Sequence, residues 1–420
     1  MKLSSIAWNA AGLGAPLVVA VVTLKPLLTL LGQERYGLLS LAWGLTAVAG
    51  LFDLGVGRAT TRVVAEQIGR GELHKTRATL KSSVRIAGGV GTAAGAVFAL
   101  AICAHLYRAL NFSPALDTEV FAASLLLALC IPLQATIATY RGVCEALQRF
   151  RGISLLRMAL GVANFGLPLA IAQFTTHLAW LLFGLLAARC GALLAFRLLA
   201  LNSAPLPASQ PAPPPNVDIR GLLAAGGWFT VSACIGAVFV QADRFFIGAK
   251  LSAAAVTTYT VPFDLVTQLL IGVTAISTVT YPTIATQLHT NPAAARTLFL
   301  RWLYIVTVGM AVLMLVVAVL LPTVLQLWLG HLLPPESVSV GRWLCLGVWI
   351  NAIGTMLFAF LHAQARYRET AFLHIVELPI YVVALLALLH IYGVEGAAIA
   401  WTARVVVDTA ILSVMASKKL

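Results

Sequence analysis

Residues 302–321 read WLYIVTVGMAVLMLVVAVLL, and this run decides the fold class. It contains no charged residue, and an α-helix of about 20 such residues is long enough to cross the hydrocarbon core of a bilayer. We therefore expect a membrane-spanning helix over about 297–321.

Similar apolar runs occupy most of the 420-residue chain, which is 60% hydrophobic and only 10% charged, with a mean hydropathy of +0.92. A soluble globular protein carries roughly 25% charged residues, so a soluble enzyme is excluded. We predict an all-α polytopic membrane protein with about 12 transmembrane helices, which leaves no room for a sizeable soluble catalytic domain. The other candidate helices lie at about 8–31, 36–58, 84–107, 119–141, 153–173, 177–199, 219–248, 255–285, 338–361, 371–391 and 394–416.

The positive charge is distributed unevenly between the two sides of this predicted bundle. The net charge is +13, which in a soluble domain would suggest nucleic acid as a partner. Placing both termini in the cytoplasm puts most of the cations on that side, which is the asymmetry of the positive-inside rule. We therefore expect an N-in/C-in topology and no nucleic acid. The opposite loops hold Arg35, Arg108, Lys250 and Arg342, and replacing the loop residue Arg35 should cost little.

A proline-rich stretch, APLPASQPAPPPNV at 204–217, divides the chain near its middle. Such a sequence favours an extended, semi-rigid coil. We expect an N-terminal six-helix bundle over 1–203, a cytoplasmic linker over 204–217 and a C-terminal six-helix bundle over 218–420. Arg149-Phe150-Arg151 and Arg366-Tyr367-Arg368 occupy matching places in the halves, which favours an internal repeat.

Four stretches carry a resemblance to a known family. They are PLL at 26–28 followed by LGQERYGL at 31–38, LFDLGVG at 51–57, RGVCEALQRF at 141–150, and Asp243 to Ile247 with Tyr259. Their order resembles that of the polysaccharide-biosynthesis flippases, the Wzx-type O-antigen translocases of the multidrug/oligosaccharidyl-lipid/polysaccharide exporter superfamily.

This resemblance implies a function and a set of partners. The function is export of a polyprenyl-diphosphate-linked oligosaccharide across the bacterial inner membrane, by alternating access between two six-helix bundles. The partners are that lipid-linked glycan, membrane lipid, and a polysaccharide polymerase with a chain-length regulator. We expect no cofactor and no metal, because GxxxxGK[ST], GxGxxG and CxxC motifs are absent from the sequence.

Ionisable residues inside predicted helices are the candidate site residues, because each costs on the order of 3 kcal/mol to insert. Arg244 is a candidate for binding a phosphate through its guanidinium, with an ion pair to Asp243 or to a loop carboxylate at the interface as the alternative. Asp264 is a candidate coupling carboxylate or a helix-start carboxylate near Tyr259. Arg244 continues a small and polar stripe made by Gln241, Ala237, Cys234, Thr230 and Gly227, which favours a cavity on that face.

Four further residues complete the candidate set. Lys25 is a cavity cation or a lysine that snorkels to the outer interface. Arg404 is a cavity cation, or it is neutralised by Asp408 one turn away. Glu377 is a candidate protonation switch or a residue that faces the second bundle. Asp53 is a proton or cation site, or a partner of an arginine such as Arg58.

Two other functions share some of these features. A multidrug antiporter of the same fold would prefer an acidic, aromatic cavity, whereas Lys25, Arg244 and Arg404 are basic. An integral-membrane polymerase or glycosyltransferase usually needs a substantial outer loop with clustered polar groups, whereas the outer loops here are short. A scaffold would need no intramembrane charge.

Overall fold

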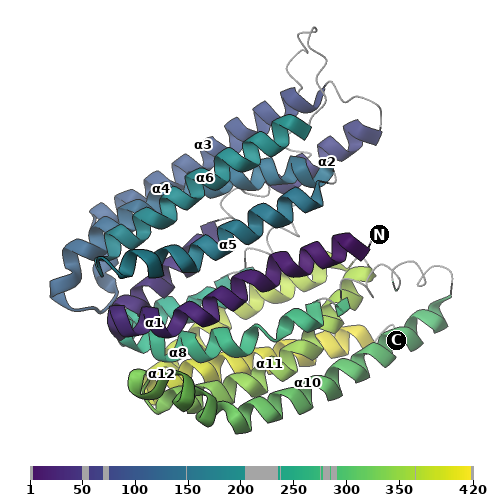
Figure 1. The fold of residues 1–420 in the computed structure, drawn as a ribbon. Coiled ribbons are helices and arrows are strands. Elements are labelled where there is room, and N and C mark those ends of the chain that lie inside the picture. Colours follow the sequence, from purple (N-terminus) through teal and green to yellow (C-terminus); the bar gives the residue numbers. More distant parts are fainter. Residues whose placement is uncertain are drawn as a thin grey trace. The chain divides into compact units, whose positions relative to one another are not determined.

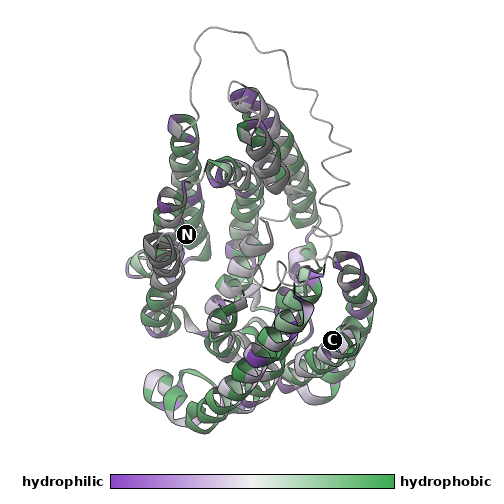
Figure 2. Ribbon diagram, turned by 90° about the vertical axis from the view of Figure 1, so that its right-hand side faces the viewer, coloured by the Kyte–Doolittle hydropathy of each residue, from purple (hydrophilic) through white to green (hydrophobic). Residues whose placement is uncertain are grey.

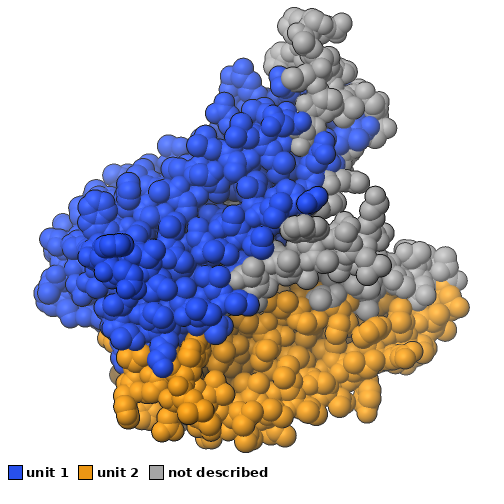
Figure 3. All heavy atoms as spheres, in the orientation of Figure 1, with its two compact units in different colours: residues 1–230 blue, residues 231–420 orange. Residues whose placement is uncertain are grey.

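The computed structural model describes residues 3–49, 56–69, 75–147, 149–203, 235–236, 238–274, 276–277, 284, 291–364 and 366–417 (Figure 1). In these ranges the regular structure is helical, with no β-strand. The chain forms two compact units, Met1–Thr230 and Val231–Leu420, coloured separately in Figure 3. The predicted linker at 204–217 and the candidate Asp53 lie outside the described residues.

In the described residues of unit 1, six α-helices and two short 3₁₀ turns are present. Helix α4 packs against α2, α3 and α6, and α5 packs against α1 and α6. The elements are α1 (Leu3–Ala49), α2 (Val56–Gly69), α3 (Thr76–Cys103), η2 (Leu106–Ala109), η3 (Pro114–Leu116), α4 (Asp117–Ala146), α5 (Phe150–Ala172) and α6 (Leu178–Ser203).

Unit 2 has α11 at its centre, packed against α8, α10 and α12. Residues 238–250 form a further helical segment, which agrees with the end of the helix predicted at 219–248. The remaining elements are α8 (Ala253–Thr267), α10 (Pro292–Leu329), η4 (Gly330–Leu332), α11 (Glu336–Ala363) and α12 (Tyr367–Ser417).

The described helices have the length and apolar surface of membrane spans. Seven of them are long and apolar enough to cross a bilayer, including the decisive run at 302–321 inside α10. Figure 2 shows hydrophobic residues, in green, along most of the length of these helices. Exposed apolar side chains such as Leu315 and Leu327 on α10 fit a surface that meets lipid. The protein is therefore a multi-pass membrane protein.

Two glycines break long helices into pairs. Gly32 lies inside α1 at φ 73° and Gly393 lies inside α12 at φ 58°. This left-handed region is strained for residues with a Cβ atom, so glycine suits both positions. Each break falls in a gap between predicted helices, 8–31 and 36–58 in one case and 371–391 and 394–416 in the other.

The second predicted helix differs from the structure at its end. The described residues of the helix predicted at 36–58 are helical, over 36–49 in α1 and 56–58 in α2, and α2 (Val56–Gly69) continues past the predicted end to Gly69. Apolar residues of α2 face its neighbours, with Val64 fully buried. The amphipathic pattern of α2 is too short and too polar for a hydropathy-based prediction of a span.

Close packing of α3 on α4 uses small residues, as expected for helices in a membrane. A Cβ atom on Gly91 would lie 2.8 Å from Cα of Pro132, and one on Gly95 would lie 2.8 Å from the carbonyl oxygen of Ala128. The glycines of α3 therefore serve helix packing, in agreement with the absence of a phosphate-binding motif.

Arg35 is held in a polar clasp, which corrects the expectation that it is a dispensable loop residue. Its Nε and Nη2 donate to the carboxylate of Glu119, at 3.2 and 2.8 Å. Glu119 also accepts from the backbone N–H of Leu178 at 3.1 Å, and His177 lies 4.0 Å away. The clasp therefore joins α1 to the first turns of α4 and α6.

Candidate functional site

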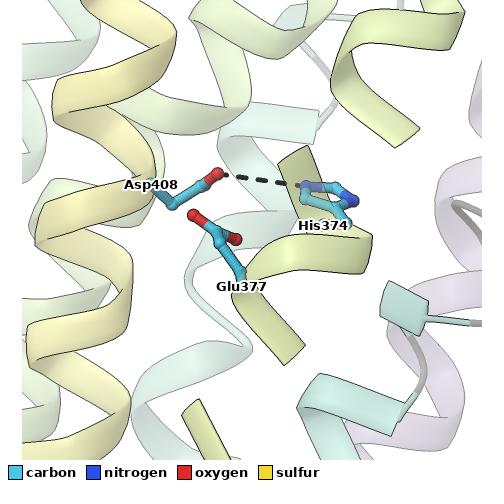
Figure 4. Close-up of side chains that lie close together, drawn as sticks. All are labelled: His374, Glu377 and Asp408. Atoms are coloured by element: carbon cyan, nitrogen blue, oxygen red, sulfur yellow. Dashed lines mark ion pairs between the residues drawn. The ribbon is translucent and has the colours of Figure 1, made fainter. Parts of the chain in front are cut away.

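Three ionisable side chains meet inside unit 2, as Figure 4 shows. His374 and Glu377 come from the first half of α12, one turn apart, and Asp408 comes from its second half. Nε2 of His374 lies 3.9 Å from Oδ1 of Asp408, and one ligand atom from each of the three residues falls within 4.8 Å of the others. The break at Gly393 brings the two halves of α12 together at this point.

The two carboxylates of this cluster are buried, and three of their four oxygens have no hydrogen-bond partner among the described residues. Glu377 is 6% exposed and Asp408 is 7% exposed. The three oxygens without a partner are Oε1 and Oε2 of Glu377 and Oδ1 of Asp408. Burying an unpaired carboxylate is costly, and two adjacent carboxylates repel each other. The pair is therefore suited to binding a proton or a small cation.

Arg404 supplies one positive charge near the pair without forming an ion pair in the described structure. Its guanidinium carbon lies 4.0 Å from the ring centroid of Phe239. Asp408 lies within ion-pair distance of His374, and among the described residues it makes no direct ion pair with Arg404. The geometry therefore does not support direct neutralisation of Arg404 by Asp408. Two carboxylates and one guanidinium leave one negative charge, which a single proton or monovalent cation would balance.

Aromatic rings separate this cluster from a second buried carboxylate, Asp243. The ring of Phe239 meets those of His374 and Tyr381, at 5.9 and 5.7 Å between centroids. Asp243 is fully buried and accepts a hydrogen bond from the hydroxyl of Tyr259. The Tyr381 hydroxyl is buried with no hydrogen-bond partner among the described residues. Unit 2 thus contains a continuous polar and aromatic interior.

Arg244 forms an ion pair with Asp264. Nη2 of Arg244 donates to Oδ1 of Asp264 at 2.5 Å, and the guanidinium lies 5.4 Å from the ring centroid of Phe263. The Arg244 side chain is 7% exposed whereas that of Asp264 is 47% exposed. A ligand that approaches this ion pair would therefore meet Asp264 before Arg244.

The position of Asp264 within α8 excludes the helix-start explanation. Helix α8 begins at Ala253, where the Ser252 hydroxyl accepts from the backbone N–H of Ala255 and caps the helix. Asp264 lies in the last turn, where the helix dipole disfavours a negative charge. Its charge is stabilised by Arg244 instead.

The remaining two candidates belong to the N-terminal half of the chain. Lys25 is exposed on α1 in unit 1, and Asp53 lies outside the described residues. Of the three clustered residues, the sequence predicts a functional role for Glu377 but not for His374 or Asp408. The spacing of His374 and Glu377 is the signal in the sequence, whereas the approach of Asp408 depends on how the two halves of α12 pack.

A turn between α11 and α12 lies near one end of this interior. Arg366 donates to both carboxylate oxygens of Glu369, at 2.8 and 2.5 Å, and to the backbone carbonyl of Met415 at 2.7 Å. The hydrogen bond to Glu369 holds the pKa of Arg366 above its ordinary value. Arg366 therefore stays charged and fixes this turn to the end of α12.

Solved structures of transporters share the fold. An inward-facing multidrug resistance MATE family transporter of the MOP superfamily is similar with a TM-score of 0.75 and 14% identity, over 100% of this chain and 94% of that chain. A MATE transporter of Vibrio cholerae in the bent form is similar with a TM-score of 0.62 and 18% identity, over 100% and 98% of the two chains. At these identities the likeness establishes the fold.

The amino-acid sequence gives the family. A protein of Shigella flexneri named "Putative O-antigen transporter" is 26% identical over 411 residues, which cover 96% of this chain and 95% of that protein. The family described as "Polysaccharide biosynthesis protein" matches residues 3–287. The chain is a membrane transporter that belongs to the polysaccharide biosynthesis protein family, the Wzx-type flippase family that its sequence motifs resemble.

Proposed function

We propose that this protein is a flippase that moves a polyprenyl-diphosphate-linked oligosaccharide from the cytoplasmic to the outer leaflet of the bacterial inner membrane. The substrate is an O-antigen, capsule or exopolysaccharide repeat unit. Two six-helix bundles, within an N-in/C-in topology of 12 helices, alternate in their access to the two sides. The protein performs no covalent chemistry in this scheme.

The buried Glu377 and Asp408 pair is the observation that carries the proposal of active transport. Three oxygens of this pair have no hydrogen-bond partner among the described residues, and one arginine lies nearby. Burying such a pair is costly, and binding and releasing a proton or cation in each transport cycle would give it a function. Coupling to an ion gradient then drives net export. Asp264 and Asp53 are the further carboxylates proposed to take part in coupling or to line the cavity.

Arg244, Lys25 and Arg404 are proposed to contact the diphosphate of the substrate. Arginine offers a planar fork of donors that matches phosphate oxygens. Since Arg244 is paired with Asp264, the substrate must replace that carboxylate or bind beside it. The half-exposed position of Asp264 supports such an exchange. Membrane lipid accommodates the polyprenyl tail, and a polysaccharide polymerase with a chain-length regulator would use the exported product.

The alternatives find less support. A multidrug antiporter shares the fold, but the family match is to polysaccharide biosynthesis and the candidate cations suit an anionic substrate. A polymerase or glycosyltransferase needs a polar outer site. In the described loops the charges of Arg108 and Asp117 are paired, because Arg108 donates two hydrogen bonds to the Asp117 carboxylate, at 3.0 and 2.8 Å.

Reconstitution tests the function directly. The purified protein is placed in liposomes that contain lipid-linked oligosaccharide extracted from the source organism, and an impermeant glycosidase reports the fraction in the outer leaflet. The proposal predicts that the protein increases the digestible fraction beyond that of protein-free liposomes. Equal digestion with and without protein, in vesicles shown to contain folded protein, would refute it. Transport of cationic drugs alone would instead favour the antiporter.

A further inference from the structure

A second buried histidine lies on the far side of His374 from the carboxylate pair. His362, in the last turn of α11, is 9% exposed, and its Nε2 lies 3.1 Å from the hydroxyl of Thr370 on α12. Thr370 and His374 are four residues apart on α12, which places them on the same face one turn apart. His362, Thr370, His374 and the carboxylate pair therefore follow one another along the interface of α11 and α12.

An aromatic ring holds the two histidines beside this path. The ring of Phe358 lies 3.9 Å from that of His362 and is stacked at 5.7 Å on that of His374, with an angle of 7° between the latter planes. Phe239 covers another side of His374. Apolar walls of this kind exclude bulk water and confine proton transfer to the polar side chains.

The charged and titratable groups around the path can be named by element. His374 faces Asp408 and Arg404 on the second half of α12, Glu377 on its own half, and His362 on α11. The segment 238–250 contributes Phe239 at His374 and, one turn further, Asp243 near Tyr381. At the other end of the path stand Arg366 and Glu369, which are paired with each other.

We propose that the coupling ion is a proton and that His362, Thr370 and His374 form the path by which it leaves the Glu377 and Asp408 pair. This inference rests on the proposed function. The protonated carboxyl group gives its proton to Nε2 of His374, which releases one from its other ring nitrogen. That proton passes through the Thr370 hydroxyl, directly or over one water, to His362 and then to solvent. The carboxyl group becomes a carboxylate and each imidazole becomes its other tautomer, which rotation of the ring restores before the next cycle. Only N–H and O–H bonds form and break.

The path leads toward the turn between α11 and α12. Arg366 lies in this turn and Arg368 in the first turn of α12, and the positive-inside rule places both in the cytoplasm. Protons would therefore reach the carboxylate pair from the outer side and leave through His362 to the cytoplasm. Inward proton movement is the direction that drives outward movement of the lipid-linked glycan.

Imidazole suits this task because one of its two ring nitrogens can accept a proton while the other donates one. Replacing a transfer group of this kind usually costs about 100-fold or more. His362→Gln keeps an amide beside Thr370 but cannot carry a proton. Thr370→Val removes the hydroxyl, and Thr370→Ser keeps it. The matched control is His390→Gln, because His390 is exposed on α12 and outside the path.

The test measures glycan translocation and internal pH together, in proteoliposomes with an imposed pH gradient and an enclosed pH-sensitive dye. The inference predicts that His362→Gln and Thr370→Val lower the gradient-driven rate of both processes by at least about tenfold. Thr370→Ser and His390→Gln should stay within about twofold of the original protein. Binding of the lipid-linked glycan should be unchanged in all four, which separates proton release from substrate recognition.

Several outcomes would overturn the inference. Translocation by the original protein that responds to a sodium gradient and not to a pH gradient would refute the proton while leaving the flippase intact. Equal rates for Thr370→Val and Thr370→Ser would refute the path. Loss of folding in His362→Gln leaves the threonine pair as the deciding comparison. Absence of translocation by the original protein would instead refute the proposed function.

Discussion

The guanidinium of Arg244 lies 2.5 Å from the carboxylate of Asp264, with the arginine buried and the aspartate half-exposed. This asymmetry means that the two partners are not equivalent. Removing Asp264 leaves a buried charge without its nearest counter-ion, whereas removing Arg244 leaves a carboxylate that water can reach. Breaking a buried ion pair typically costs several kcal/mol, and exposure of one partner reduces that cost.

Asp264→Ala should therefore destabilise the protein more than Arg244→Ala. We expect a loss of roughly 3 kcal/mol for the first and a smaller loss for the second. Thermal unfolding of the purified variants in detergent measures the order. Equal losses of stability in the two variants would contradict the difference in burial between Arg244 and Asp264.

If Arg244 contacts the diphosphate, Arg244→Ala should reduce transport more than Asp264→Ala does, although it destabilises the protein less. Arg244→Ala should abolish delivery of lipid-linked oligosaccharide to the outer leaflet, and Arg244→Lys should recover part of it, because lysine keeps the charge and loses the fork. Outer-leaflet digestion in proteoliposomes measures both. Arg342→Ala, at an exposed position on α11, is the control and should transport normally. Normal transport by Arg244→Ala would remove Arg244 from the substrate site.

Arg35→Ala should weaken the clasp in unit 1. It removes both hydrogen bonds to the buried Glu119, and charged hydrogen bonds contribute roughly 1.5–3 kcal/mol each when buried, less when one partner is 31% exposed as here. We expect a loss of about 1–2 kcal/mol in the free energy of unfolding. A melting temperature equal to that of Arg342→Ala would contradict the clasp.

Gly393→Ala should also destabilise the protein, although nothing lies within 4 Å of the added Cβ atom. The cost comes from the backbone, since φ is 58° and a left-handed conformation costs roughly 1–2 kcal/mol with a Cβ atom. Gly309→Ala is the matched control, because Gly309 has equal space but lies inside α10, where alanine is the better helix former. A lower melting temperature for Gly309→Ala than for Gly393→Ala would contradict the role of the joint.

The membrane class and many helix positions follow from hydropathy alone, because a span must be apolar over about 20 residues. The run at 302–321 shows this. The part of α2 that follows residue 58 was not predicted, because it is polar and packs on α3 and α4. Glu377 could be singled out because an ionisable residue in an apolar run is costly. Its approach to Asp408, and the choice of Asp264 as partner of Arg244, depend on helix packing that no local pattern encodes.

The central claim is that the Glu377 and Asp408 pair binds the ion that couples transport to a gradient. The most direct measurement is the rate of lipid-linked oligosaccharide translocation in proteoliposomes, as a function of the imposed pH gradient, for the original protein, Glu377→Gln and the exposed control Glu336→Gln. We predict that the rate rises with the gradient in the original protein and in Glu336→Gln, and that Glu377→Gln is slow at every gradient with unchanged abundance and folding. A Glu377→Gln variant whose rate rises with the gradient as steeply as that of the original protein would contradict the account.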